Sequence, residues 1–160
     1  MNVAIVMYDK MNLLSFSNVL SFLHSFDDIN IKTCAFKQEI KDEFGVRIHP
    51  DVYAESIYGA DVIIIPDGIG ALTLRYDEIF LSWIKSASKT KLKIGLNLGT
   101  LILAGAGFLQ NKEASIRGGY KNALSEYCKV SDLKALQSED IISASEWADE
   151  IKDKLYEIFK

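Results

Sequence analysis

The chain has 160 residues, which is enough for one domain with a sizeable hydrophobic core. Hydrophobic residues make up 49% of the sequence and charged residues 25%, proportions that are ordinary for a globular protein. The net charge of −4 argues against nucleic acid as a main partner, because phosphate binding needs a basic face. No apolar run approaches the roughly 18 to 20 residues of a membrane span. We therefore expect a single domain over residues 1–160 that binds neither nucleic acid nor a membrane.

The N-terminus and the cysteines indicate a cytoplasmic protein. The opening residues MNVAIVMYDK contain no basic region and no small-residue cleavage site, so we expect no secretory signal. Cys34 and Cys128 lie far apart and form no CxxC pair, which favours free thiols in a reducing compartment. The two histidines, His24 and His49, have no cysteine or serine partner at a recognisable spacing and belong to no metal-binding cluster. We expect neither a metal nor a cofactor.

Strands and helices alternate along the chain. The apolar spacing predicts strands at 2–7, 29–36, 61–65, 92–96, 114–116 and 141–144, and a small hairpin within 39–50. It predicts helices at 13–23, beginning near Asn12 or Ser15, at 79–87 and at 98–106, ended by Gly107, and a short helix within 118–127. A C-terminal helix follows, and its inner face carries Trp147, Ile151, Leu155 and Ile158. Continuously apolar strands that alternate with helices indicate a mainly parallel sheet covered on both faces, a doubly wound α/β fold.

The turns beyond the strands mark the expected site. In open α/β sheets ligands bind outside the carboxyl ends of the strands, which here means residues 8–11, 66–70 and 97–99. The stretch KIGLNLGTLILAGAGFL contains an apolar approach, a Gly-x-Asn-x-Gly turn and an apolar helix, which is the outline of a nucleophile elbow. Such a turn usually presents Ser or Cys, but here it presents Asn97.

Four stretches in order resemble the ThiJ/PfpI family of the class I glutamine-amidotransferase-like superfamily. They are VAIVMYDKMNLLSF (3–16), DVIIIPDGIGALTL (61–74), IGLNLGTLILAGAGFLQNKEAS (94–115) and SEDIISAS (138–145). The resemblance spans nearly the whole chain, and the isocyanide-hydratase-like branch is nearest, from the NLL and PDGIG segments. It implies a flavodoxin-like three-layer sandwich and a homodimer that uses the first helix and residues near the elbow.

Three side chains depart from the family's pattern together. The family places a cysteine at the position of Asn97, an acidic residue at that of Ser15 and, in some members, a histidine near Arg117 or Gly118. The resemblance preserves the backbone groups, since the family's oxyanion-binding N–H groups correspond to Gly68 or Ile69 and to Leu98. An elbow also lies at a helix N-terminus, where free N–H groups favour an anion or a polarised carbonyl.

Each candidate residue has more than one interpretation. Asn97 fits a turn with positive φ, but its amide could also bind a ligand, whereas covalent catalysis is disfavoured because an amide lacks basicity. Arg117 could bind a carboxylate or phosphate or lie on the surface, and Ser15 could pack or cap the first helix. Asp9 could serve as a turn residue or line the pocket. Asp67 stands where the family often has glycine, and its negative charge would work against an anionic ligand. The predicted ligand-binding set is Asn97, Leu98, Gly68, Ile69, Arg117 and Asp9.

These observations leave three hypotheses for function. The first, favoured because the departures agree, is a catalytically degenerate ThiJ/PfpI-like protein that binds a small polar or carbonyl-type ligand, or a protein partner, at a retained elbow pocket. The second is an active hydratase, amidase or glyoxalase in which water is the nucleophile and Asp9 or Asp67 serves as general base. The third is a regulatory or structural subunit.

Overall fold

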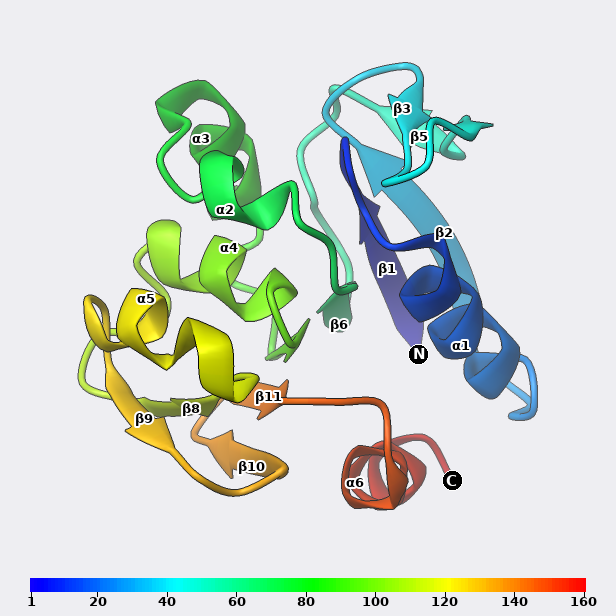
Figure 1. The fold of residues 1–160 in the computed structure, drawn as a ribbon. Helices are drawn as coiled ribbons and strands as arrows, with labels where there is room; N and C mark the ends of the chain where they lie inside the picture. The colour runs from blue at the N-terminus through cyan, green and yellow to red at the C-terminus, as the bar shows by residue number, and fades with distance from the viewer.

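The computed structural model describes all 160 residues and contains a central seven-stranded sheet. The strand order is β10-β11-β7-β6-β1-β2-β5, and every neighbouring pair is parallel except β10 and β11 (Figure 1). Helices α2 to α5 lie on one face of the sheet, and α1 and α6 lie on the other. The predicted mainly parallel, doubly wound α/β fold is therefore confirmed.

The elements follow one another as strands and short helices. The strands are β1 (Asn2–Met7), β2 (Asn30–Ala35), β3 (Ile40–Lys41), β4 (Arg47–Ile48), β5 (Val52–Tyr53), β6 (Val62–Ile65), β7 (Leu92–Leu96), β8 (Glu113–Ser115), β9 (Lys129–Ser131), β10 (Ala135–Ser138) and β11 (Ile141–Ala144). The helices are α1 (Leu13–Leu23), α2 (Ala71–Leu74), α3 (Glu78–Lys85), α4 (Gly99–Gly105), η1 (Gly118–Tyr120), α5 (Lys121–Ser125) and α6 (Asp149–Phe159). The longest, α1 and α6, have 11 residues each, and no helix has the length and apolarity required to span a bilayer.

The long apolar elements agree with the predictions because burial dictates their pattern. Strands β1, β6 and β7 are buried over almost their whole length, as expected for the centre of a parallel sheet. Helix α1 begins after Asn12, whose side chain accepts a hydrogen bond from the N–H of Ser15 at 2.8 Å. This N-cap satisfies one of the free donors of the first turn. The predicted hairpin is also present, as β3 paired antiparallel with β4.

Several short elements differ from the predictions. The C-terminal helix buries Ile151, Leu155 and Phe159, whereas Trp147 precedes the helix and packs edge-on against Phe22 at 5.7 Å between ring centroids. Strand β8 does not join the main sheet but pairs with β9, which the sequence pattern did not indicate. Strands β5 and β10 and helix α2 were also missed. Elements of two to four residues carry too little periodicity to be recognised.

Candidate functional site

The predicted elbow is a tight turn between β7 and α4. Asn97 has φ of 48°, in the left-handed region that Asn tolerates better than most residues, and only 3% of its surface is exposed. Its N–H donates to the carbonyl of Ala144 on β11 at 2.7 Å. A Cβ on Gly99 would lie 2.3 Å from the carbonyl oxygen of Ile65, so only glycine allows the turn to pack against β6. The strand–turn–helix context expected of an elbow is therefore present.

The side chain of Asn97 is hydrogen-bonded by the protein itself. Its Nδ2 donates to Oδ1 of Asp67 at 3.2 Å, and its Oδ1 accepts from the N–H of Arg117 at 2.9 Å. The N–H of Leu98 donates to the same Oδ1 of Asp67 at 3.1 Å. A carboxylate oxygen of the chain thus occupies the position at which the N–H after an elbow residue would hold an oxyanion.

The turn that carries Asp67 is held by contacts with the start of α1 and with the hairpin. The N–H of Asp67 donates to Oγ of Ser15 at 3.0 Å, and its carbonyl accepts from the N–H of Asn12 at 2.8 Å. The N–H of Ile69 donates to Oε2 of Glu43 at 2.9 Å. Of the N–H groups predicted to bind an oxyanion, those of Leu98 and Ile69 are therefore each paired with a carboxylate of this chain, whereas that of Gly68 has no acceptor within the chain.

Tyr8 fixes the start of the same turn. Its hydroxyl donates to the carbonyl of Pro66 at 2.5 Å, and its side chain is buried. Burial, followed by the negative charges of Asp67 and Glu43, raises the pKa of the Tyr8 hydroxyl well above its ordinary value. The hydroxyl therefore remains a hydrogen-bond donor. Gly68 lies against this residue, because a Cβ on Gly68 would be 2.8 Å from the Tyr8 oxygen and 2.6 Å from the Cα of Met11.

Asp9 faces the β3–β4 hairpin. Its carboxylate pairs with Lys37 and accepts the N–H of Lys41 at 3.1 Å. It borders a polar hollow that the hairpin encloses, and it makes no hydrogen bond to the elbow. Asp9 is thus grouped with the hairpin, whereas Ser15 and Asp67 are grouped with Asn97.

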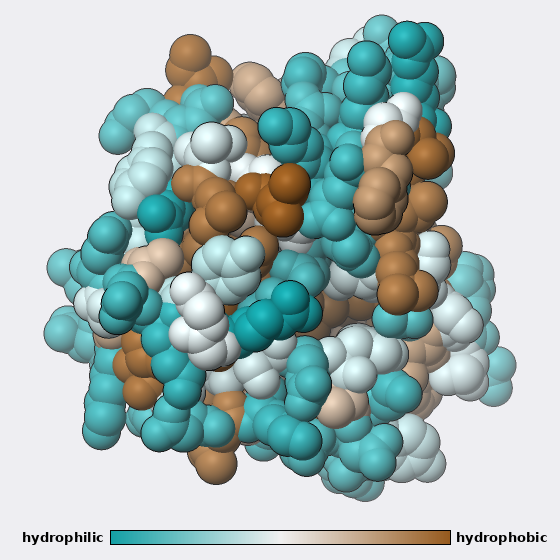
Figure 2. All heavy atoms as spheres, in the orientation of Figure 1, coloured by the Kyte–Doolittle hydropathy of each residue, from teal (hydrophilic) through white to brown (hydrophobic).

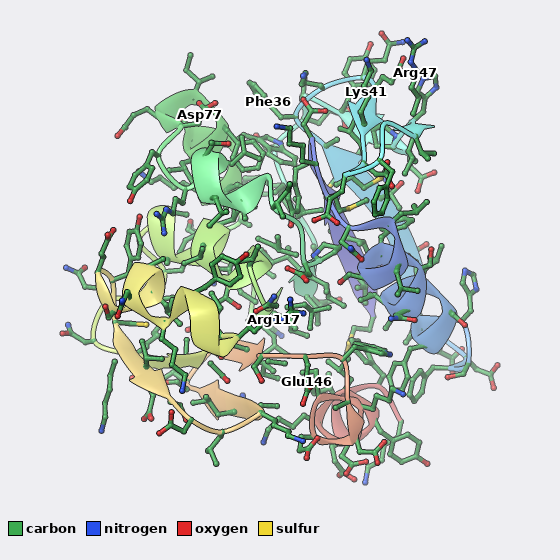
Figure 3. All side chains as sticks on the ribbon, viewed as in Figure 1. Phe36, Lys41, Arg47, Asp77, Arg117 and Glu146 are labelled. Atoms are coloured by element: carbon green, nitrogen blue, oxygen red, sulfur yellow. The ribbon has the colours of Figure 1, made fainter.

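Arg117 contacts the elbow through its backbone, and its side chain is exposed without an ion pair (Figure 3). A hollow of about 250 Å³ lies beside it, lined by Gly118, Lys121, Asp132, Lys134 and Glu146 among others. Lys121 pairs with Asp132, and Lys134 pairs with Glu146 at 3.3 Å. The guanidinium of Arg117 is consequently an unpaired cation next to the elbow. On the face shown in Figure 2, hydrophobic side chains gather over α2 to α4 and over the hairpin and α1, with hydrophilic ones between.

Neither cysteine is activated. Burial raises the pKa of the Cys34 thiol to about 12. Burial also raises the pKa of Cys128, despite a hydrogen bond from the backbone of Ala114 that lowers it. The thiolate is the nucleophilic form, so both residues are poor nucleophiles at neutral pH. The structure holds no group of three or more His, Cys, Asp or Glu side chains that could bind a metal ion.

The sequence pattern identified the turn at Asn97 but missed some of the groups that bind near it. Tyr8 lay in a segment predicted to border the site but was not assigned a role, Glu43 was not a candidate, and the role of Asp67 at the elbow was left open. The signal for Asp67 was an acidic residue at a position where the resemblance leads one to expect glycine. Glu43 carried no such signal, because it lies in a polar hairpin that reaches the site only through tertiary packing.

Comparison with known proteins gives one curated relative and many similar structures. No protein-family model matches the chain. Isonitrile hydratase of Pseudomonas putida is 25% identical over 127 residues, which cover 78% of this chain and 55% of that protein. The chain thus spans little more than half the length of the curated relative that it matches.

Similar solved structures include members of the ThiJ/PfpI and DJ-1 group. A ThiJ/PfpI family protein from Pseudomonas syringae has a TM-score of 0.82 and 19% identity, with 90% of this chain and 62% of that chain covered. Drosophila melanogaster DJ-1beta has a TM-score of 0.84 and 16% identity, with 99% and 89% covered. The putative protease I from Bacteroides thetaiotaomicron has a TM-score of 0.80 and 18% identity, with 99% of both chains covered. At these identities the structures show a common fold.

Proposed function

We propose that this chain, which belongs to the ThiJ/PfpI family, is a catalytically degenerate member that binds a small polar ligand or a protein partner without turning over a substrate. The observation that carries the proposal is the hydrogen bonding of Asn97 and Leu98 to Asp67. An amide stands where a nucleophile would stand, and a carboxylate of the chain stands where an oxyanion would bind. Acyl or hydration chemistry would use the side chain at position 97 and the N–H of Leu98, and both are hydrogen-bonded to Asp67.

The geometry favours a ligand that donates hydrogen bonds over one that presents a carbonyl or an anion. A carbonyl oxygen would have to displace Oδ1 of Asp67 from the N–H of Leu98. The second oxygen of Asp67, Oδ2, makes no hydrogen bond within the chain, and the residue is half-buried. An amine, amide or hydroxyl group of a ligand could donate to this oxygen, while Arg117 offers a cation to an acidic group of the same ligand.

A second candidate function is hydration by an activated water. Asp67 supports it, since its carboxylate lies at the elbow, as a general base for water would have to. Asp9 gives no such support, because its carboxylate is engaged by Lys37 and Lys41. The match to isonitrile hydratase makes isonitriles the first substrates to test.

The test is to follow formamide production from cyclohexyl isocyanide by the purified chain and by its Asn97→Ala variant. We expect both to produce formamide no faster than buffer alone, because neither has a nucleophile at the elbow. Hydration that is well above buffer in the unmodified chain and is lost with Asn97→Ala or Asp67→Asn would overturn the degenerate assignment and establish the second candidate.

We also propose a homodimer formed through the elbow face. Leu14 on α1 is 68% exposed and Phe44 on the hairpin is 84% exposed, so two large apolar side chains flank this face. Light scattering after size exclusion should give twice the mass of one chain, and Leu14→Asp with Phe44→Asp should shift the protein toward the monomer. Exposed Tyr58, which lies on the segment between β5 and β6, provides a control as Tyr58→Asp. A monomeric mass at micromolar concentration in the unmodified chain would contradict this proposal.

A further inference from the structure

One face of the sheet near β1 and β2 lacks a covering helix. In a doubly wound fold the connection between consecutive parallel strands usually carries a helix, but the connection from β2 to β6 carries only β3, β4, β5 and an extended segment. We call residues 54–60 of this segment the strap. The strap is anchored where the Nε1–H of Trp83 donates to the carbonyl of Glu55 at 2.6 Å and the N–H of Ile57 donates to Oγ of Ser86 at 2.9 Å.

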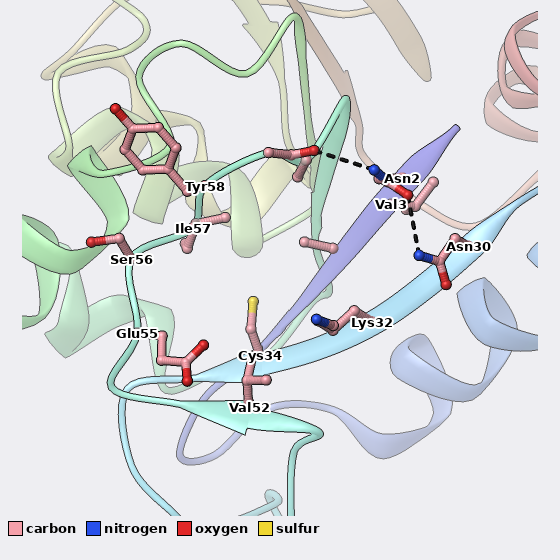
Figure 4. Close-up of a pocket in the computed structure, with 13 residues that line it drawn as sticks. Asn2, Val3, Asn30, Lys32, Cys34, Val52, Glu55, Ser56, Ile57 and Tyr58 are labelled. Carbon is pink, nitrogen blue, oxygen red and sulfur yellow. Dashed lines mark hydrogen bonds between the residues drawn. The ribbon is translucent and has the colours of Figure 1, made fainter.

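A cavity of about 170 Å³ lies between the strap and the sheet (Figure 4). It borders the amino-terminal half of β1, at the opposite end of that strand from the elbow. Its apolar walls are formed mainly by Val3, Ala4, Cys34, Val52 and Ile57. Because the strap has no helix to project large side chains onto the sheet, the space in front of the small Ala4 stays unfilled.

Two unpaired opposite charges stand at the mouth of the cavity. Lys32 lies beside Ala4 in the parallel register of β1 and β2, and Glu55 belongs to the strap. In Figure 4 both side chains extend toward the space next to Cys34. Neither forms an ion pair, and neither side chain has a hydrogen-bond partner within the chain, although most acidic and basic residues of the nearby hairpin are paired. Cys34 remains a neutral thiol and contributes to the apolar wall.

We propose that this cavity binds a small zwitterion with an apolar body, such as an aliphatic α-amino acid, whose carboxylate pairs with Lys32 and whose ammonium pairs with Glu55. The size is suitable, because an apolar protein cavity of about 150 Å³ can hold benzene, which is comparable to a branched aliphatic side chain. A ligand with only one charge would leave the other charge of the mouth unpaired beside its apolar body. A zwitterion pairs both and places only its apolar part against the walls, the arrangement typical of small-molecule sites.

The test is a titration of the ¹⁵N-labelled chain, followed by NMR, with L-leucine, 4-methylpentanoate and isoamylamine. The three probes share the branched aliphatic body and differ only in their charged groups. We expect L-leucine to bind most tightly, with shifts confined to the strap and to the amino-terminal halves of β1 and β2. Each exposed charge pair is worth at most about a fivefold change in the dissociation constant.

Two variants and a control assign the two charges. Lys32→Met should remove the advantage of L-leucine over isoamylamine, and Glu55→Gln should remove its advantage over 4-methylpentanoate. Lys129→Met, which changes an exposed and unpaired lysine on β9, should leave all three dissociation constants unchanged. The proposal is overturned if no probe shifts the strap at tens of millimolar, if the shifts lie elsewhere, or if L-leucine binds no better than both single-charge probes. Because every readout is at the strap, this result is independent of the elbow.

Discussion

Changing Asn97 to Cys and Asp67 to Gly together should create a thiol that reacts readily with iodoacetamide at neutral pH. Its rate should be at least about tenfold higher than that of the thiol in Asn97→Cys alone, since lowering the thiol pKa by one unit raises the thiolate fraction about tenfold. In the single variant the new sulfur would lie next to the carboxylate that now accepts the Asn97 amide at 3.2 Å. A neighbouring negative charge disfavours the thiolate and raises its pKa. Gly at position 67 removes that charge and frees the N–H of Leu98 at the N-terminus of α4, which favours the thiolate.

The control for this comparison is Asn97→Cys with Asp9→Asn. It removes a carboxylate from the same edge of the sheet, but one that pairs with Lys37 rather than with the elbow, so the rate should match that of Asn97→Cys alone. Peptide mass spectrometry would separate the new thiol from Cys34 and Cys128, whose raised pKa values make them slow. Equal rates in the single variant and in the double variant with Gly at position 67 would show that Asp67 does not block the anion site.

Adding Ser15→Glu to the reactive double variant extends the same reasoning. Ser15 now accepts the N–H of Asp67 at 3.0 Å, so its side chain already faces the turn and not only α1. A glutamic acid there would place a carboxyl group near the new thiol. Ser15, Asp67 and Asn97 are thus connected by hydrogen bonds at the same turn.

The sequence was sufficient to predict the sheet and the turn between β7 and α4 because both depend on local patterns. Continuous apolar strands identify β1, β6 and β7, and two glycines around Asn97 identify the turn. The carboxylate at the elbow was harder to predict, because the side chain of Asp67 reaches Leu98 across 31 positions of the chain. The sequence places Asp67 in the right turn, but it does not specify the direction of its side chain.

The charged group at the amino end of β7 was not predicted for a similar reason. Lys93 alternates with apolar neighbours in a strand and would ordinarily be assigned to an exposed position, yet its side chain is only 2% exposed. Its Nζ donates to the carbonyl of Thr90 at 2.9 Å and to Oδ2 of Asp140 at 3.0 Å. It also lies 4.9 Å from the ring centroid of Phe108. Nothing in the local pattern indicates that a partner 47 positions away, just before β11, allows this lysine to be buried.

Asp140→Asn should therefore destabilise the fold by about 2 kcal/mol or more, measured as the free energy of unfolding in urea. Removing one partner of a buried pair costs about 3–5 kcal/mol because the remaining charge is left uncompensated, and the 35% exposure of the Asp140 side chain reduces that figure. The matched control is Asp132→Asn, which breaks another Asp–Lys pair whose acidic side chain is 93% exposed, and it should cause no measurable change.

Lys93→Met provides the complementary variant, because it replaces the buried cation by an apolar chain of similar length. It should cost less than Asp140→Asn, since Asp140 keeps its hydrogen bond from Lys112 and no unpaired buried charge remains. The variant with both changes should then be more stable than Asp140→Asn alone. Equal costs for Asp140→Asn and Asp132→Asn, or no recovery in the double variant, would mean that Lys93 does not depend on Asp140 for its burial.

The same carboxylate predicts how stability depends on pH. Burial alone would raise the pKa of Asp140, but hydrogen bonds from Lys112 and Lys93 outweigh it, so the pKa in the folded state lies below its ordinary value. A carboxyl group whose pKa is lowered by folding stabilises the protein above its unfolded-state pKa, and this contribution disappears as the pH falls through the folded-state pKa. The difference in unfolding free energy between the unmodified chain and Asp140→Asn should therefore stay constant from about pH 7 to about pH 5 and shrink below about pH 4. A difference that grew on acidification would contradict the assignment, because the pair would then be stabilised by the protonated carboxyl group.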